Sequence, residues 1–355
     1  MAIELLKWIE IDLGAIRENL SWVLQRLRPG VRLMAVVKAD GYGHGAVPVA
    51  RLAAASGASC LGVLSVEEAA ELRAAGIEAP LVLLSPPLPS QAAEVARLRL
   101  ESTVDTEALA AALAKGAGRR RAPIHLDLDF GLRRWGAPAA KASALVARLQ
   151  KNGRLRLAGL STHLDYVPGK NAVEAAEKLQ RFLRLAEDAK RRVPGLACHA
   201  ANSSIVLDFP DFQLDLARVG NLLYGINPTR TAAPLRAPWR FQARIIALGR
   251  VARGQPIGYA SEFVAAKPMT VATVPVGYSD GLTMEPMERL IRFGVGARYW
   301  GMLRGRQAPF VGRCAISHAL LDVTGIPGVK VGEPVALPIR RTAANARIPR
   351  LYLGA

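Results

Sequence analysis

The sequence has few cysteines and no long hydrophobic run. Three cysteines, Cys60, Cys198 and Cys314, are spread over 355 residues. An odd, widely spaced set indicates neither a disulfide framework nor a zinc knuckle, so we expect free thiols and no metal site. No run of about 18 apolar residues occurs, which argues against a membrane span. The first residues, MAIELLKWIEID, lack a basic segment followed by a long apolar core, so no signal peptide is recognised and a cytoplasmic location is expected.

Acidic residues are scarce relative to basic ones. The chain has 47 lysines and arginines but 29 aspartates and glutamates, a net charge of +18. Such an excess raises the question of nucleic-acid binding. The basic residues are dispersed, however, with short clusters only at 119–121, 190–192 and 340–341, and no recognition motif accompanies them. We therefore expect no nucleic-acid partner.

Short apolar segments alternate with helical segments through the first two thirds of the chain. Asp12 is placed to begin a helix, and the clearest helical periodicity covers 172–192, with Val173 and Leu179 on its apolar side. Eight strand-to-helix repeats predict an α/β protein with a (β/α)₈ TIM-type barrel, and a doubly wound open sheet is the alternative. The expected strands are 34–39, 60–65, 80–85, 101–105, 123–129, 155–163, 196–202 and 214–220.

The composition and the periodicity of the sequence change beyond residue 227. Residues 228–238 are rich in proline, threonine, alanine and arginine without a period, which suggests a linker. Short strand-like runs broken by glycine and proline follow and predict an all-β domain. We expect a barrel domain at 1–234 and a C-terminal β domain at 235–355, with 1–11 able to join the β domain instead.

The most informative stretch is AVVKADGYGHG at 35–45. An apolar run ends in Lys38, and a turn-rich segment follows, as at the carboxyl end of a buried strand. Desolvation there can lower the pKa of an amine, as Schiff-base chemistry with a carbonyl cofactor requires. The alternative is an ordinary solvated lysine at a strand end.

Other polar residues follow the predicted strands at the same rim, where barrel active sites lie. Ser203 and Ser204, with backbone N–H groups near Gly220 and Asn221, are placed to bind an anion. The rim residues are Lys38 at the end of strand one, Arg134 after strand five, Thr162 and His163 at the end of strand six, Asn202, Ser203 and Ser204 at the end of strand seven, and Arg218 and Gly220 at the end of strand eight.

Six motifs in order give the chain a resemblance to a known family. They are AVVKADGYGHG, STH at 161–163, HAANSS at 199–204, ARVGNLLYG at 217–225, GYA at 258–260 and PVGYSDG at 275–281. The chain resembles the alanine racemase family, pyridoxal 5'-phosphate enzymes with an N-terminal barrel and a C-terminal β domain. The resemblance implies an isomerase that interconverts L- and D-alanine, as for a bacterial cell wall, and a homodimer that shares its active sites.

The resemblance also implies roles for individual residues. Lys38 would carry the cofactor as an aldimine and act as the base on one face, and Tyr259 of the partner subunit would act on the other. Racemisation needs a base on each face, because the proton leaves one side of a planar centre and returns to the other. His163 would hydrogen-bond to Tyr259 and be coupled to Arg218, which would donate to the pyridine nitrogen.

The resemblance assigns further residues to the cofactor and the substrate. Arg134, preferred over Arg133, would bind the substrate carboxylate, and Tyr278 would line the entrance. The backbone N–H of Ile316 would also reach the carboxylate. The remaining cofactor-binding residues would be Tyr42, Asn202, Ser203, Gly220 and Asn221.

Four positions depart from the family pattern. Asp127 stands where many members have a carbamylated lysine that braces the arginine matched here by Arg134; since Asp127 already carries a negative group, we expect it to orient Arg134 without carbon dioxide. Ile316 and Ser317 replace an adjacent methionine and aspartate, and Ala346 replaces a tyrosine.

These changes leave open a racemase of serine or of a broader set of amino acids. A related decarboxylase is less favoured, because such enzymes use a β-domain cysteine in a glycine-rich context that this chain lacks. A non-catalytic single-barrel relative is disfavoured by the β domain itself.

Overall fold

A computed structural model describes residues 4–261, 263–282 and 299–354 of the chain. The chain divides into two compact units, Leu13–Ala237 and a second formed by the residues up to Asp12 together with those from Pro238 onward. We placed the boundary between residues 234 and 235, and the structure has it between 237 and 238. Each unit is described by itself below.

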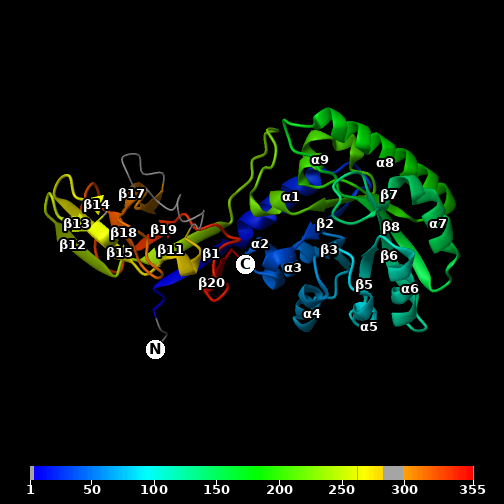
Figure 1. The fold of residues 1–355 in the computed structure, drawn as a ribbon, viewed down its shortest axis with the longest axis horizontal. Helices are drawn as coiled ribbons and strands as arrows, with labels where there is room; N and C mark the ends of the chain where they lie inside the picture. Colours follow the sequence, from blue (N-terminus) through cyan, green and yellow to red (C-terminus); the bar gives the residue numbers. More distant parts are fainter. Residues whose placement is uncertain (1–3, 262, 283–298, 355) are drawn as a thin grey trace. The chain divides into compact units, whose positions relative to one another are not determined.

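The unit Leu13–Ala237 is built on eight parallel strands (Figure 1). The strand order is β10-β2-β3-β4-β5-β6-β8-β9. Two hydrogen bonds link the end strands through the residues that flank them: Arg218 N in β10 donates to Ala201 O, just after β9 (2.8 Å), and Asp215 N, just before β10, donates to Cys198 O in β9 (3.1 Å). The predicted (β/α)₈ barrel is therefore confirmed. Its strands are β2 (Arg32–Val36), β3 (Cys60–Val63), β4 (Leu81–Leu83), β5 (Leu100–Val104), β6 (Ala122–Asp129), β8 (Leu155–Thr162), β9 (Ala197–His199) and β10 (Leu216–Val219), and the short β7 (Ala137–Pro138) pairs with β6.

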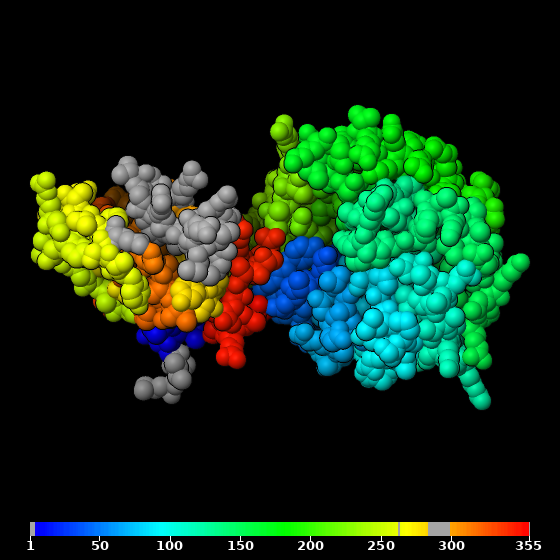
Figure 2. Space-filling view, in the orientation of Figure 1, coloured from blue at the N-terminus to red at the C-terminus, as the bar shows by residue number. Residues whose placement is uncertain are grey.

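Helices cover the outside of these strands, and successive repeats follow one another around the unit from blue through cyan to green (Figure 2). Side-chain caps mark several helix starts: Ser65 accepts from Glu68 N and Thr106 from Leu109 N, each at 3.3 Å. The helices are α1 (Leu13–Arg26), α2 (Lys38–Tyr42), α3 (Ala46–Ala55), α4 (Val66–Ala74), α5 (Ala92–Arg97), α6 (Glu107–Gly116), α7 (Ala142–Lys151), α8 (Ala172–Arg192) and α9 (Ser203–Asp208), with short 3₁₀ turns at Pro89–Gln91, Ala139–Lys141, Pro210–Phe212 and Asn221–Tyr224.

The segment that leads out of the barrel is pinned to it by one buried side chain. Asn19 of α1 donates to the carbonyls of Leu223 (3.2 Å) and Arg236 (2.7 Å), and its own carbonyl accepts from Arg236 N (2.8 Å). The stretch expected as a linker has no helix or strand, yet its end at Arg236 is held in place by these bonds.

The second unit is dominated by β-structure, which confirms the predicted all-β domain. Its main sheet has the order β12-β15-β18-β17-β16-β19-β11-β1-β20, in which the N-terminal strand β1 pairs with β11 and β20. The strands are β1 (Lys7–Asp12), β11 (Trp239–Arg244), β12 (Ala247–Val251), β13 (Pro256–Ile257), β14 (Phe263–Val264), β15 (Met269–Val274), β16 (Trp300–Leu303), β17 (Arg306–Val311), β18 (Ala319–Asp322), β19 (Pro334–Leu337) and β20 (Arg350–Leu353), with 3₁₀ turns at Tyr259–Ser261 and Tyr278–Asp280.

None of the helices in the described ranges is both long enough and apolar enough to cross a membrane.

Candidate active site

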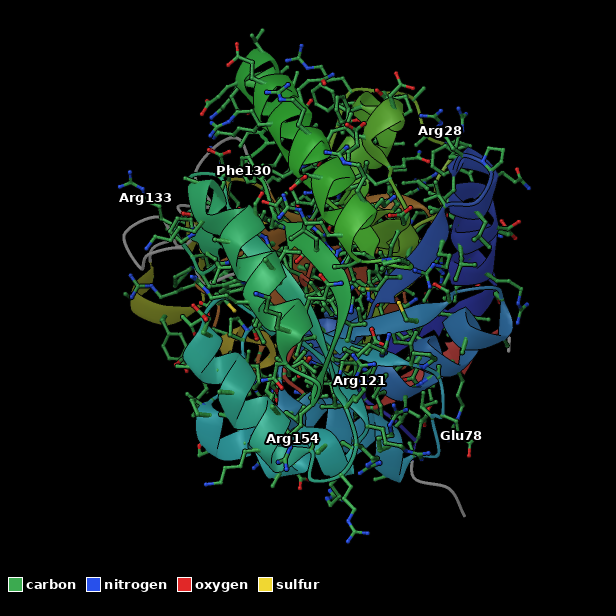
Figure 3. All side chains as sticks on the ribbon, turned by 90° about the vertical axis from the view of Figure 1, so that its right-hand side faces the viewer. Arg28, Glu78, Arg121, Phe130, Arg133 and Arg154 are labelled. Carbon is green, nitrogen blue, oxygen red and sulfur yellow. The ribbon has the colours of Figure 1, made fainter. Side chains whose placement is uncertain are left out.

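A cavity of about 230 Å³ lies at the carboxyl ends of the barrel strands. It brings together the barrel residues that the sequence analysis assigned to the cofactor, the substrate or an anion, whereas Thr162 of the expected rim does not line it. The residues that line it are Lys38, Tyr42, Asp127, Arg134, His163, Asn202, Ser203, Ser204, Arg218, Gly220 and Asn221. Arg134 borders this cavity, whereas Arg133 points away from the barrel into solvent (Figure 3).

Lys38 lies at the start of a left-handed turn. We placed it as the last residue of a strand, but β2 ends at Val36 and Lys38 opens α2. Ala39, Asp40 and Tyr42 have φ of 51°, 53° and 56°, a conformation that costs about 1–2 kcal/mol for each non-glycine residue. Strain of this kind is concentrated at functional sites.

Two carboxylates hold this turn in place. Glu68 accepts from Ala39 N and from Leu64 N, both at 2.7 Å, and thereby fixes the residue next to Lys38. Asp40 accepts from Ala46 N at 2.8 Å, which ties the far end of the turn to α3. Sequence reasoning missed Glu68, because its contact with the turn crosses from one repeat to the next.

The cavity is strongly positive. Burial lowers the pKa of the Lys38 amine, and the nearby charge of Arg134 lowers it further. Burial also lowers the pKa of Arg134, and it lowers that of Arg218 to about 10. Asp127 is the only carboxylate among the described residues that line the cavity. Three cations against one carboxylate favour a ligand that carries phosphate or carboxylate groups.

Asp127 is hydrogen-bonded to Ser161 and not to Arg134, which we expect it to orient. Its carboxylate accepts from the Ser161 hydroxyl at 2.5 Å, and no ion pair joins it to Arg134 within the described ranges. The guanidinium of Arg134 lies instead over the Trp135 ring, 4.0 Å from the ring centroid. The aspartate side chain has a single methylene group, so its carboxylate reaches only as far as Ser161 on the neighbouring strand β8. Asp127 therefore acts on Arg134 only through its charge.

Asp127 should make the folded chain less stable as the pH rises. Burial raises the pKa of its carboxyl to about 6, so the folded state binds this proton more tightly than the unfolded state does. The stabilisation that this tighter proton binding gives the folded state is present below the ordinary aspartate pKa and is lost as the pH rises through about 6. We expect Asp127→Asn, measured by urea unfolding without added ligand, to be about 2–3 kcal/mol more stable than the native chain at pH 8 and equal to it near pH 4.

A surface aspartate provides the control for this prediction. Asp211 has a side chain that is 85% exposed, so Asp211→Asn should change stability little at either pH. A gain for Asp127→Asn that is the same at pH 4 and pH 8 would contradict the assigned titration.

His199 is the histidine that contacts Arg218. The Arg218 guanidinium donates to His199 Nδ1 at 2.7 Å and to the carbonyls of His199 (2.8 Å) and Thr162 (2.7 Å). His163, which we expected to be coupled to Arg218, feels it through charge: burial and then Arg218 lower the pKa of His163 to about 3, so its ring is neutral. His199 could have been recognised in the sequence as a site residue, because it occupies an inward-facing strand position just before the serines of the HAANSS motif.

A close approach of two elements shapes the end of the cavity next to β10. The Tyr42 ring stacks on Tyr224, with centroids 4.7 Å apart, and Tyr224 donates to Val36 O at 3.0 Å. A Cβ at position 220 would lie 2.4 Å from the Tyr42 hydroxyl oxygen, so only glycine fits there. Asn202 caps α9 by accepting from the N–H groups of residues 204 and 205, at 3.0 and 3.1 Å.

The remaining predicted residues lie in the β unit, which is described apart from the barrel cavity. Tyr259, Tyr278 and Ile316 are 64%, 42% and 57% exposed. Their loops adjoin one another: Tyr278 N donates to Ala315 O at 3.1 Å, and a Cβ on Gly258 would lie 3.2 Å from the backbone next to Gly312. The unit therefore presents two tyrosines and an isoleucine on neighbouring loops.

Comparisons with known proteins agree with this arrangement. The family model for the alanine racemase N-terminal domain matches residues 11–228, and that for the C-terminal domain matches residues 239–349. The alanine racemase of Syntrophobacter fumaroxidans is 38% identical over 335 residues, which cover 93% of this chain and 87% of that protein. The chain belongs to the alanine racemase family. The alanine racemase of Desulfovibrio desulfuricans is 34% identical and covers 98% of both chains.

Solved structures give the same result for the fold. The crystal structure of alanine racemase from E. faecalis superposes with a TM-score of 0.88 at 28% identity and covers 98% of each chain. That from Streptomyces lavendulae superposes with a TM-score of 0.86 at 29% identity, covering 100% of this chain and 98% of the other. The resemblance inferred from the six motifs is therefore confirmed as membership of the alanine racemase family.

Proposed function

We propose that this chain interconverts L- and D-alanine with pyridoxal 5'-phosphate held in the barrel cavity. The observation that carries the proposal is the position of Lys38, an amine with a lowered pKa beside Arg134 and Arg218 in one cavity of an alanine racemase family chain. An amine that loses its proton readily is required for covalent attachment of a carbonyl cofactor.

The residues of the cavity fit this cofactor. Lys38 supplies the amine for its aldehyde, and the Tyr42 hydroxyl, which packs against Gly220, lines the cavity with Ser203 and Asn221 and is available to donate to a phosphate. Arg218 is buried and faces the same cavity, where its guanidinium would meet the pyridine nitrogen. When bound, the cofactor supplies an electron sink that makes the Cα–H bond of an amino acid acidic.

Different side chains of the protein bind the substrate and transfer its proton. Arg134 binds the substrate carboxylate, a role for which its fixed fork of donors is suited. Lys38 removes or returns the proton on one face of Cα, and Tyr259 does so on the opposite face. His163, whose ring is neutral, is available to accept from the Tyr259 hydroxyl.

A second copy of the chain is proposed to supply Tyr259. Exposed tyrosine and isoleucine side chains on adjoining loops are typical of a surface that is covered by a partner. Tyr278 and Ile316 belong to these loops, so the partner would also contribute the entrance and a backbone contact to the substrate. We propose a homodimer in the cytoplasm that supplies D-alanine for cell-wall synthesis.

The direct test is an assay of the purified chain with bound cofactor against a panel of L-amino acids, with chromatographic detection of the D-enantiomers. We expect D-alanine to form fastest. Ala346 is small and exposed where the family pattern has a tyrosine, so serine is the second substrate to examine. If serine is racemised faster than alanine, serine replaces alanine as the proposed substrate. If no amino acid is racemised, the proposed function is overturned.

Gly220→Ala should weaken cofactor binding. Its Cβ would press on the Tyr42 hydroxyl, and overpacking of this kind costs about 1–3 kcal/mol, which corresponds to roughly a 10- to 100-fold higher dissociation constant. The measurement is a titration of the cofactor-free chain, followed by absorbance. Gly153→Ala is the matched control, because a Cβ there has nothing within 4 Å. Equal dissociation constants for the two variants would exclude the proposed phosphate position.

A further inference from the structure

A continuous chain of hydrogen bonds runs through the barrel interior from Arg218 to Glu101. Arg218 on β10 donates to His199 Nδ1 at 2.7 Å. His199 Nε2 lies 2.8 Å from His125 Nδ1, and His125 Nε2 lies 2.7 Å from Glu101 Oε2. Both histidines are almost fully buried, at 3% and 2% exposure. Each member of the chain comes from a different strand, and the four are called the relay below.

The two ends of the relay fix the position of every proton within it. An arginine only donates and a carboxylate only accepts, so His199 must accept at Nδ1 and carry its proton on Nε2. That proton is donated to His125 Nδ1, and His125 in turn donates from Nε2 to Glu101. Burial, followed by the charge of Arg218, holds the pKa of His199 well below its ordinary value, so its ring is neutral and carries this single proton.

Gly159 makes the contact between the two histidines possible. Strand β8 lies between β6 and β9, and Gly159 is the β8 residue paired with His125. A Cβ at position 159 would lie 2.1 Å from His125 Nδ1, the atom that meets His199. The glycine therefore leaves the space through which the His125 ring reaches a strand that is not its neighbour.

The outer end of the relay lies at the opposite end of the barrel. Glu101 pairs with Arg156 at 2.9 Å and borders a second cavity of about 340 Å³, which Arg121 also lines. Figure 3 shows Arg121 and Arg154 at this end, away from Arg133. Burial alone would raise the pKa of Glu101, but the hydrogen bond from His125 and the charge of Arg156 lower it to about 2. Glu101 is thus an anion at neutral pH.

We infer that Glu101 is a positioning residue that sets the tautomers of His125 and His199 and so holds Arg218 in place for the cofactor. The inference rests on the proposed function, which places the pyridine nitrogen against Arg218. Without an acceptor at Glu101, His125 Nε2–H is a buried donor with no partner, and the opposite tautomer becomes favourable. His199 would then present a proton to Arg218, and two donors would face each other.

The test compares the full chain with Glu101→Leu, which removes the acceptor, and Glu101→Gln, which keeps an acceptor oxygen but loses the charge. Nitrogen-15 NMR of labelled histidines reads the tautomers with and without the cofactor, and the absorbance band of the bound cofactor and kcat are measured alongside. Glu78→Gln is the matched control, because Glu78 lines the same second cavity and makes no contact with the relay.

We expect Glu101→Leu to shift the nitrogen resonances of both histidines, move the cofactor band and lower kcat roughly 10- to 100-fold, as expected when a buried donor loses its partner. Glu101→Gln should recover most of the native tautomer, and Glu78→Gln should match the native chain. Should Glu101→Leu not fold, Gly159→Ala interrupts the relay at its centre and should give the same shifts.

Unchanged histidine resonances in both Glu101 variants would overturn the inference. It would also be overturned if Glu78→Gln shifted these resonances as much as Glu101→Leu does. The NMR readout does not depend on turnover. Shifted tautomers in a chain that racemises no amino acid would support the relay and contradict the proposed function.

Discussion

Replacing Lys38 by alanine is expected to reduce alanine racemisation by roughly 10³-fold or more, because one substitution removes both the covalent attachment of the cofactor and a base. The amine has a lowered pKa and is held by the left-handed turn, so no other described residue of the cavity can take its place. The measurement is the initial rate of D-alanine formation at saturating cofactor. The absorbance band of lysine-bound cofactor should be lost in parallel.

Lys115→Ala is the control for this prediction. Lys115 lies in the last turn of α6 on the exposed surface of the same unit, so its loss should leave the rate and the absorbance band unchanged. A Lys38→Ala chain that keeps both the band and more than about a tenth of the native rate would show that another residue carries the cofactor.

Tyr259→Phe is expected to lower the racemisation rate about 10²- to 10⁴-fold, since the variant loses the base on one face but keeps the cofactor. The sharper test mixes this variant with Lys38→Ala under conditions that exchange subunits. If each active site combines Lys38 of one copy with Tyr259 of the other, half of the chains form mixed dimers that have one intact site. The mixture should therefore recover roughly a quarter of the native activity although each parent alone has at most about a hundredth of it.

Mixing also distinguishes a shared site from one built within a single chain. No recovery, in a mixture shown by native mass spectrometry to contain mixed dimers, would place both bases in the same copy. Tyr278→Phe in place of Tyr259→Phe is the control: it should retain substantial activity alone, because the proposed role of the Tyr278 hydroxyl, at the entrance, transfers no proton.

Much of the barrel could be predicted from the sequence. Parallel strands that are buried on both faces read as short apolar runs, and each is followed by a helical period, so their number and order were evident. Lys38 and Arg218 could be placed at one rim for the same reason, because the carboxyl ends of such strands converge. Periodicity is weaker at helix ends: 172–192 is helical as predicted, but Val173 is 77% exposed, since the buried stripe begins at Ala175.

The relay could not be predicted in this way. His125 and His199 meet only because Gly159 leaves space on the strand between them, and no local pattern reports a contact that passes over a strand. The hydrogen bond between Asp127 and Ser161 was missed for a related reason. The distance that a short side chain spans decides between Ser161 on the next strand and Arg134 on a loop, and spacing in the sequence does not record that distance.

The left-handed turn at Lys38 illustrates a further limit of sequence patterns. Ala39 has no preference for positive φ, and aspartate adopts it only occasionally, so the contacts of Glu68 and the bond from Ala46 to Asp40 hold both residues in this conformation. Strain that is maintained by contacts from other repeats becomes visible only in the folded chain.

The most direct measurement follows L-alanine by proton NMR in D₂O with the purified chain and pyridoxal 5'-phosphate. A base on each face of Cα predicts loss of the Cα–H signal as deuterium enters, equal final amounts of L- and D-alanine, and no release of carbon dioxide. Retention of the Cα–H signal, or its loss with carbon dioxide release, would contradict the assignment of this chain as a two-base alanine racemase.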